Sequence, residues 1–154
     1  MSIELIDQLN ACRQRAESAL QGVNPGIVVF AATDSTPAWT VKDLVGHITT
    51  WEEEMLKSWL AHLEGKVHTV DGDEDLFNND KVILSRDSSY EQILENWHTV
   101  RAKVVEAISQ ATPQQLEEEF TLAWDERGTL ALAVKGLVWH EDLHINDIAQ
   151  AVRG

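Results

Sequence analysis

Long runs of helical periodicity constrain the fold of this chain more than any other feature of its sequence. Apolar residues recur every three or four positions over four stretches, and only 8 glycines and 3 prolines interrupt the 154 residues. This spacing places apolar side chains along one face of a helix, whereas strands would show alternation. The sequence therefore predicts four helices, near residues 2–22, 40–64, 88–111 and 129–151.

Four amphipathic helices predict an all-α fold, a four-helix bundle that forms a single domain over residues 1–154. The polar connection between the second and third helices has about 20 residues, which is long enough to return along the bundle. Short loops join antiparallel helices, whereas a long crossover permits parallel ones. We expect the second and third helices to run parallel, with no sheet beyond an incidental short pairing.

The charge balance is strongly acidic, with 12 Lys and Arg against 26 Asp and Glu and a net charge of −14. This charge repels phosphate and anionic lipid, so we expect no nucleic-acid partner and no membrane partner. No apolar run reaches about 18 residues, and the N-terminus does not resemble a signal peptide. The single cysteine, Cys12, is expected to pack as a small apolar residue, and its isolation fits a cytoplasmic protein.

Three histidines stand out because they fall on apolar helix faces. His140 and His144 are four residues apart, so both imidazoles lie on one face of the last helix, and His47 lies on the apolar face of the second helix. Two ligands from one helix and one from another would form a three-histidine metal site with positions open to water or substrate. The alternative is that these are hydrogen-bonded histidines at the helix surface or in the core.

Two other patterns resemble metal sites but fit them poorly. His140-Glu-Asp-Leu-His144 matches the H-E-x-x-H pattern of zinc proteases, but those enzymes hold peptide substrates along a strand edge, and no sheet is expected here. The acidic run at 71–75 resembles the start of a calcium loop. Leu76 replaces the turn glycine and Val82 the bidentate glutamate, so a solvated acidic loop is the better interpretation.

Four short segments are notable for their order along the chain: Trp39-Thr-Val-Lys-Asp-Leu-Val-Gly-His47-Ile, Phe77-Asn78, Ser88-Ser-Tyr-Glu-Gln-Ile-Leu and Val138-Trp-His140-Glu-Asp-Leu-His144. Together they resemble the DinB/YfiT-like proteins over nearly the whole chain. The resemblance implies a four-helix bundle with a long crossover and a divalent metal, Zn, Ni or Fe, held by three histidines. Matched residue by residue, the ligands are His47, His140 and His144. A related branch, the mycothiol-dependent maleylpyruvate isomerases, has Glu where His140 stands.

The same resemblance implies a metal-dependent enzyme acting on a small molecule, by transfer of a low-molecular-weight thiol or by metal-assisted hydrolysis. The alternative is a non-catalytic, stress-associated or small-molecule-binding bundle whose metal is structural or absent. Glu141 or Asp142 is a candidate acid, base or orienting group, and Trp124 and Trp139 are candidates for the mouth of a pocket. Family members often form dimers, so a homodimer is also expected.

The three remaining histidines fall outside this set of candidate ligands. His62 and His68 fall at the end of the second helix and in the polar connection, where we expect them to be solvated. His98 follows a tryptophan of the third helix and is expected to be structural, with contact to the pocket as the alternative.

Overall fold

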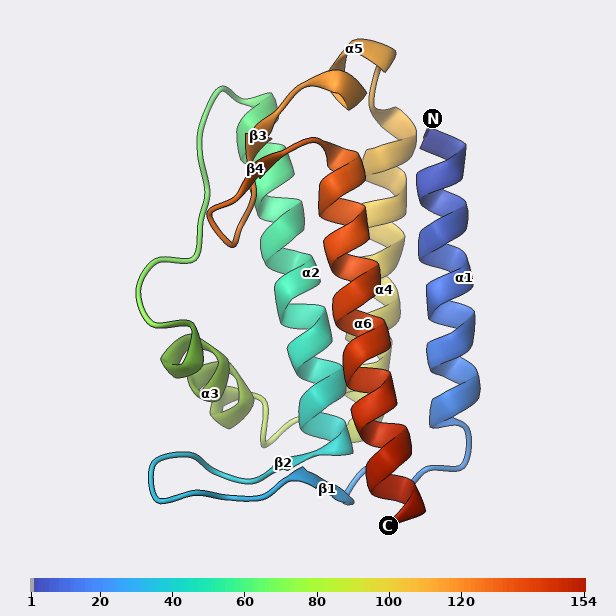
Figure 1. Cartoon of the computed structure of the whole chain (residues 1–154), viewed down its shortest axis with the longest axis vertical. Helices are drawn as coiled ribbons and strands as arrows, with labels where there is room; N and C mark the ends of the chain where they lie inside the picture. Colours follow the sequence, from blue (N-terminus) through green and yellow to red (C-terminus); the bar gives the residue numbers. More distant parts are fainter. Residues whose placement is uncertain (1) are drawn as a thin grey trace.

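The computed structural model describes residues 2–154, which form six helices and two short antiparallel hairpins (Figure 1). The elements are α1 (Ser2–Leu20), β1 (Val28–Phe30), β2 (Trp39–Thr40), α2 (Val41–Leu63), α3 (Glu74–Leu84), α4 (Tyr90–Gln110), α5 (Pro113–Glu117), β3 (Phe120–Thr121), β4 (Arg127–Gly128) and α6 (Leu130–Arg153). The four long helices are those that the periodicity predicts, and each end lies within two residues of its predicted position.

The long helices form a four-helix bundle made of two pairs of parallel helices, and the two pairs run in opposite directions. α1 and α6 run one way and α2 and α4 the other, so the helices on either side of the crossover are parallel, as predicted (Figure 1). α2 packs most extensively against α4, and α1 against α6. The only sheets among residues 2–154 are the pairings of β1 with β2 and of β3 with β4. Within the same residues, no helix is long and apolar enough to cross a membrane.

The start of α2 is fixed by a capping box. The Thr40 hydroxyl accepts a hydrogen bond from the backbone nitrogen of Asp43, and the Asp43 carboxylate accepts one from the backbone nitrogen of Thr40 at 2.8 Å. The capping box thus pairs two of the backbone donors that lack a partner within the helix at this end. The box fixes the rotation of the first turn and therefore the direction in which His47, one turn later, leaves the helix.

The crossover is not a simple loop: the acidic run at 71–75 is exposed to solvent as expected, but it leads into a helix rather than remaining a loop. Asp73 is the N-cap of α3, and its carboxylate accepts hydrogen bonds from the backbone nitrogens of Asp75 and Leu76 at 2.9 and 3.2 Å. Glu74 and Asp75 lie in the first turn, where negative charge is favoured by the helix dipole. α3 packs beside α2 and brings Asn78 to within 2.8 Å of the Trp51 indole nitrogen.

The bundle core consists of two apolar clusters with a layer of charge between them. One cluster includes Leu9, Met55, Trp59, Val104, Ile108 and Leu137, and the other includes Ala16, Leu44, Ile48, Trp97, Ile145 and Ile148. The charged layer takes one residue from each long helix: Arg13, Glu52, Arg101 and Glu141. None of these four is more than 6% exposed. We call this group the charged layer below.

Candidate metal centre

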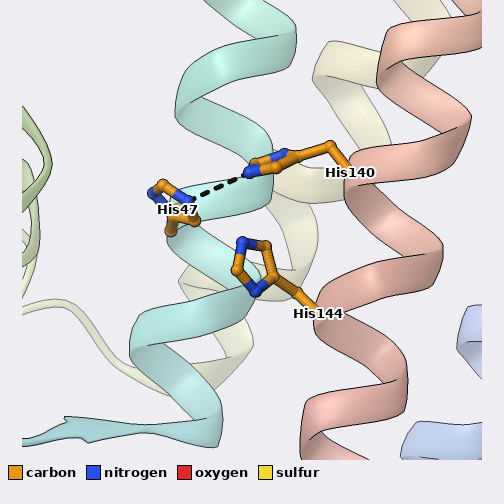
Figure 2. Close-up of side chains that lie close together, drawn as sticks. All are labelled: His47, His140 and His144. Carbon is orange, nitrogen blue, oxygen red and sulfur yellow. Dashed lines mark hydrogen bonds between the residues drawn. The ribbon is translucent and has the colours of Figure 1, made fainter. Parts of the chain in front are cut away.

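The structure brings the three predicted histidines together between α2 and α6 (Figure 2). His140 and His144 project from successive turns of α6 towards His47 on α2, with ring centroids 4.6 to 4.9 Å apart. One nitrogen atom of each ring lies within 4.8 Å of the others, and the Nε2 atoms of His47 and His140 are 3.1 Å apart. Among residues 2–154, no other group of His, Cys, Asp or Glu side chains converges in this way.

The surroundings of the three rings keep them neutral. Burial, with His140 and His144 as neighbours, lowers the pKa of His47 from 6.5 to about 2. Burial and the proximity of His144 lower the pKa of His140 to about 4. Burial also lowers the pKa of His144, although Asp147 opposes the change. Near neutral pH the cluster therefore presents unprotonated imidazole nitrogens, the form that binds metal ions.

Two side chains orient the rings. The Nδ1 atom of His144 lies 3.1 Å from a carboxylate oxygen of Asp147, and the opposite side of the ring faces the other two histidines (Figure 2). Trp39 packs edge-on against His47 with ring centroids 5.0 Å apart, and its own N–H donates to Asn79. Carboxylates that orient a metal-ligating histidine are common. Sequence reasoning missed Asp147, although its spacing of three residues from His144 on a helix was a usable signal.

The chemistry of the three donors fits a divalent transition metal. Each neutral imidazole has one nitrogen lone pair, and because one nitrogen of each ring lies within 4.8 Å of the others, all three can coordinate a single cation. Three histidine ligands leave at least one coordination position of a divalent ion open, as in catalytic sites and unlike closed structural sites. His47, His140 and His144 are thus the residues that could hold a metal ion.

Two cavities border the triad from different sides. The first, of about 460 Å³, lies against His47 and His140 and is lined largely by carbon, including three indole rings: Trp51, Trp124 and Trp139. The predicted place of Trp124 and Trp139 beside a pocket is thus confirmed. The second cavity, of about 420 Å³, lies against His47 and His144 and has a more polar lining that includes Thr36, Asp75, Asn78 and Asn79. Asn78 lines both cavities.

The two acidic residues expected to assist at the centre face away from it. Glu141 is fully buried in the charged layer, where its carboxylate accepts a hydrogen bond from the Trp97 indole at 2.8 Å. Asp142 pairs with Arg15 of α1 at 2.9 Å. Successive residues on a helix point about 100° apart, so the neighbours of His140 cannot share its direction. The expectation that Glu141 or Asp142 serves the centre as acid, base or orienting group is therefore wrong.

The other histidines lie outside the triad, but two of them are not simply solvated as expected. His62 stacks on Phe120 and lies 2.8 Å from a Glu118 carboxylate oxygen. His68 lies 2.6 Å from Glu54, a contact that ties the start of the crossover to α2. Both rings therefore have specific partners that a sequence without coordinates does not reveal. His98 is about half exposed beside Glu17.

Arg101 holds the charged layer together and joins the two helices that carry the triad. Its guanidinium donates two hydrogen bonds to Glu52 of α2 and one to Glu141 of α6 at 3.0 Å. Burial alone would raise the pKa of Glu141, but Arg101 and Arg13 outweigh it and hold that pKa below its usual value. Cys12 is buried as expected, yet its thiol also donates to Glu141 at 3.2 Å, and burial raises the pKa of this thiol.

Comparison with known proteins gives a family match and several structural matches. The model of the DinB superfamily matches residues 8–148. An uncharacterised protein from Escherichia coli UTI89 superposes with a TM-score of 0.78 at 16% identity, over 99% of this chain and 93% of that one. YfiT from Bacillus subtilis, described as a probable metal-dependent hydrolase with an unusual four-helix bundle topology, gives a TM-score of 0.74 at 18% identity, over 99% and 86%. No curated protein matches the chain in sequence.

A third structural match corrects one expectation. The colibactin self-resistance protein ClbS gives a TM-score of 0.76 at 15% identity, over 97% of this chain and 93% of that one, and it was crystallised in complex with a dsDNA. A protein of this fold can therefore be found on DNA, so the expectation of no nucleic-acid partner does not stand. The net charge of −14 describes the whole chain and does not decide what one face of the bundle can contact.

Proposed function

The chain belongs to the DinB superfamily, and on this premise we propose that it is a metal-dependent enzyme whose divalent ion is held by His47, His140 and His144. The observation that carries the proposal is the convergence of three neutral imidazoles, with nitrogen atoms within 4.8 Å of one another, beside two cavities. Sites built from imidazole accept zinc, nickel and iron, so we propose one of these ions.

When bound, a divalent ion of this kind lowers the pKa of a water or thiol ligand and polarises an electrophile. The protein's own residues supply position. Asp147 orients His144, and the packing of Trp39 limits the movement of His47. The Asn78 carbonyl oxygen accepts from Trp51, so the amide nitrogen of Asn78 is the group it can offer to a ligand in either cavity.

Two cavities that meet at one centre suit a reaction with two substrates. We propose that the polar cavity takes a low-molecular-weight thiol and the carbon-lined cavity takes a small electrophile, so that the reaction is thiol transfer. Hydrolysis is the second candidate, because YfiT is described as a probable metal-dependent hydrolase. In that case water occupies the place of the thiol, and one of the two cavities has no substrate to bind.

The test begins with metal-free protein loaded separately with Zn²⁺, Ni²⁺ and Fe²⁺. Each form is assayed for conjugation of cysteine, glutathione or mycothiol to 1-chloro-2,4-dinitrobenzene and for hydrolysis of p-nitrophenyl acetate. An enzyme is supported if a chelator abolishes turnover, if His144→Ala has no turnover and if His98→Ala keeps it. Stoichiometric metal without turnover favours the alternative, a non-catalytic bundle with a structural metal. Failure to bind any of the three ions overturns the proposal.

We also propose that the chain forms a homodimer through the outer face of α6. Trp139 is 63% exposed, and Leu143, one turn later on the same face, is 39% exposed. Apolar side chains at this spacing can pack against their symmetry mates across a two-fold axis. Light scattering is expected to give twice the monomer mass for the natural sequence and the monomer mass for Leu143→Glu. A monomer at micromolar concentration of the natural sequence would contradict this proposal.

A further inference from the structure

The carbon-lined cavity beside the triad has walls built from indole rings. Trp51 from α2, Trp124 from the turn between β3 and β4, and Trp139 from α6 all line its volume of about 460 Å³. His47 and His140 lie in the same lining, so a ligand in the cavity reaches the triad. A volume of this size is typical of sites for small organic molecules.

Hydrogen bonds hold two of these indoles in place. The Trp51 N–H donates to Asn78 at 2.8 Å, and the Trp124 N–H donates to Glu126 at 2.9 Å. Each indole has only one polar atom, so these bonds leave nothing but ring carbon to face the cavity. Trp51 is further held by Phe77, which packs against it edge-on with centroids 5.5 Å apart. The rings of Trp51 and Trp124 are thus held in place before any ligand arrives.

A glycine of α6 sets the position of the Trp124 ring. A Cβ atom added at Gly136 would lie only 2.9 Å from Cζ2 of Trp124, closer than real carbon contacts allow. The indole can therefore lie directly on the helix backbone only because residue 136 has no side chain. Any larger residue would displace the ring, so Gly136 fixes the place of Trp124 in the cavity wall.

The charges of the cavity favour an uncharged occupant. Its ionisable lining residues besides the histidines are Glu74, Glu126 and Lys135, and Glu126 is already engaged by Trp124. Within the lining, two carboxylates stand against one ammonium group, a balance that disfavours anions. Flat aromatic faces with no free polar atom are best covered by another flat apolar ring, which stacks on them or meets them edge-on.

We infer that this cavity binds an uncharged, planar aromatic ring, which forms the body of the substrate on which the triad acts. The inference rests on the proposed function, because it assigns the cavity to the same centre. The ring contacts Trp124 and Trp51, and the reacting group of the substrate points to His47 and His140.

The test titrates 2-naphthol and its saturated counterpart, decahydro-2-naphthol, into metal-free protein while the indole N–H signals are followed by NMR. The signals of Trp51, Trp124 and Trp139 are expected to move with 2-naphthol. Those of Trp59 and Trp97, buried elsewhere in the core, are an internal reference and stay fixed. The saturated compound has similar size but no flat face, and it is expected to bind at least about fivefold more weakly.

Two variants and one control locate the binding. Trp124→Leu removes one wall and is expected to weaken 2-naphthol about tenfold. Gly136→Ala displaces the same ring and is expected to weaken binding similarly. Val152→Ala, exposed on α6 but outside the lining and away from the proposed dimer face, leaves the affinity unchanged. Equal affinity for the flat and saturated compounds, or shifts of all indole signals alike, overturns the inference.

Zinc binding is measured on the same protein by calorimetry, which separates the two proposals. If zinc fails to bind while 2-naphthol moves the three signals, the proposed function fails and the aromatic site stands. If zinc binds and 2-naphthol does not, the aromatic site fails and the metal centre stands. If both the metal centre and the aromatic site exist, 2-naphthohydroxamic acid should bind the zinc-loaded protein at least about tenfold more tightly than 2-naphthol does. The reason is that its hydroxamate group reaches the triad while its ring occupies the cavity.

Discussion

Replacement of Arg101 by methionine is the sharpest test of the charged layer that joins α2 to α6. Methionine has a similar length but no charge and no donors. In the natural protein the guanidinium donates to Glu52, to Glu141 at 3.0 Å and to the backbone oxygen of Leu9 at 2.8 Å. The four buried charges sum to zero before the change, and the layer carries one excess negative charge after it.

The magnitude follows from what remains around Glu52. Its carboxylate is 1% exposed, and its remaining cationic partner is Arg13, at 3.5 Å. Removing one partner of a buried ion pair lowers the free energy of unfolding by about 3–5 kcal/mol, because the other charge stays buried without compensation. We therefore expect Arg101→Met to lower the free energy of unfolding by about 4 kcal/mol at pH 8.

The pH dependence of this loss has a definite sign. Burial raises the pKa of Glu52, and Arg101 opposes that rise, so the variant raises it further. A carboxyl group whose pKa is higher in the folded than in the unfolded state favours folding more as the pH falls towards its unfolded pKa. The difference in stability between Arg101→Met and the natural protein should therefore be smaller at pH 5 than at pH 8.

Urea denaturation followed by circular dichroism at both pH values measures these differences. Arg101→Met with Glu52→Gln restores a neutral layer, since Arg13 then faces Glu141 alone, and should recover most of the loss. A loss below about 1 kcal/mol would refute the reasoning, because it falls outside the range for a broken buried pair. The reasoning would also fail if the loss were equal at pH 5 and pH 8, or if the double variant were no more stable than the single one.

Two further predictions concern the triad. His144→Ala should lower the metal content of dialysed protein, measured by mass spectrometry, to a small fraction of that of His98→Ala, and equal contents would exclude His144 as a ligand. In metal-free protein, the free energy of unfolding should fall as the pH drops below about 6.5, by about 1.4 kcal/mol per pH unit for each histidine held neutral. The reason is that the unfolded chain binds protons there, whereas His47 and His140, with pKa values lowered to about 2 and about 4, do not. His47→Gln should reduce this slope, and a stability that is constant from pH 6.5 to pH 5 would contradict the prediction.

The fold could be predicted because the bundle follows directly from apolar periodicity. Helix ends were predictable where a capping residue marks them, as Thr40 does for α2. α3 was missed because its acidic start suggested a loop, although Asp73 followed by two acids is also a normal helix beginning. Its apolar residues remain largely exposed, so the periodic signal there is weak.

The charged layer has a recognisable pattern in the sequence. Each of its residues lies four positions after a buried apolar residue on the same helix face: Arg13 after Leu9, Glu52 after Ile48, Arg101 after Trp97 and Glu141 after Leu137. Charged residues at core positions, two of each sign, indicate a buried network. The sequence could not show which charges meet, because that depends on how the helices pack.

The three residues of the triad could be predicted from the sequence, but the side chains and cavities around them could not. His140 and His144 share a face by spacing alone, whereas their approach to His47 depends on the direction and rotation of α2 relative to α6. Asp147 and the two cavities are properties of packed side chains. The carbon-lined cavity in particular depends on the contact between Trp124 and Gly136, two residues that no helical period relates.

The central claim is that His47, His140 and His144 bind one divalent ion and leave part of its coordination sphere open. X-ray absorption spectroscopy of zinc-loaded protein tests this claim most directly. We expect one zinc per chain, with three imidazole nitrogens at about 2.0–2.1 Å and at least one further oxygen ligand from solvent. His144→Ala should remove one imidazole from the fit or abolish binding. A spectrum with fewer than three imidazoles in the natural protein, or with four protein ligands and no open position, would contradict the account.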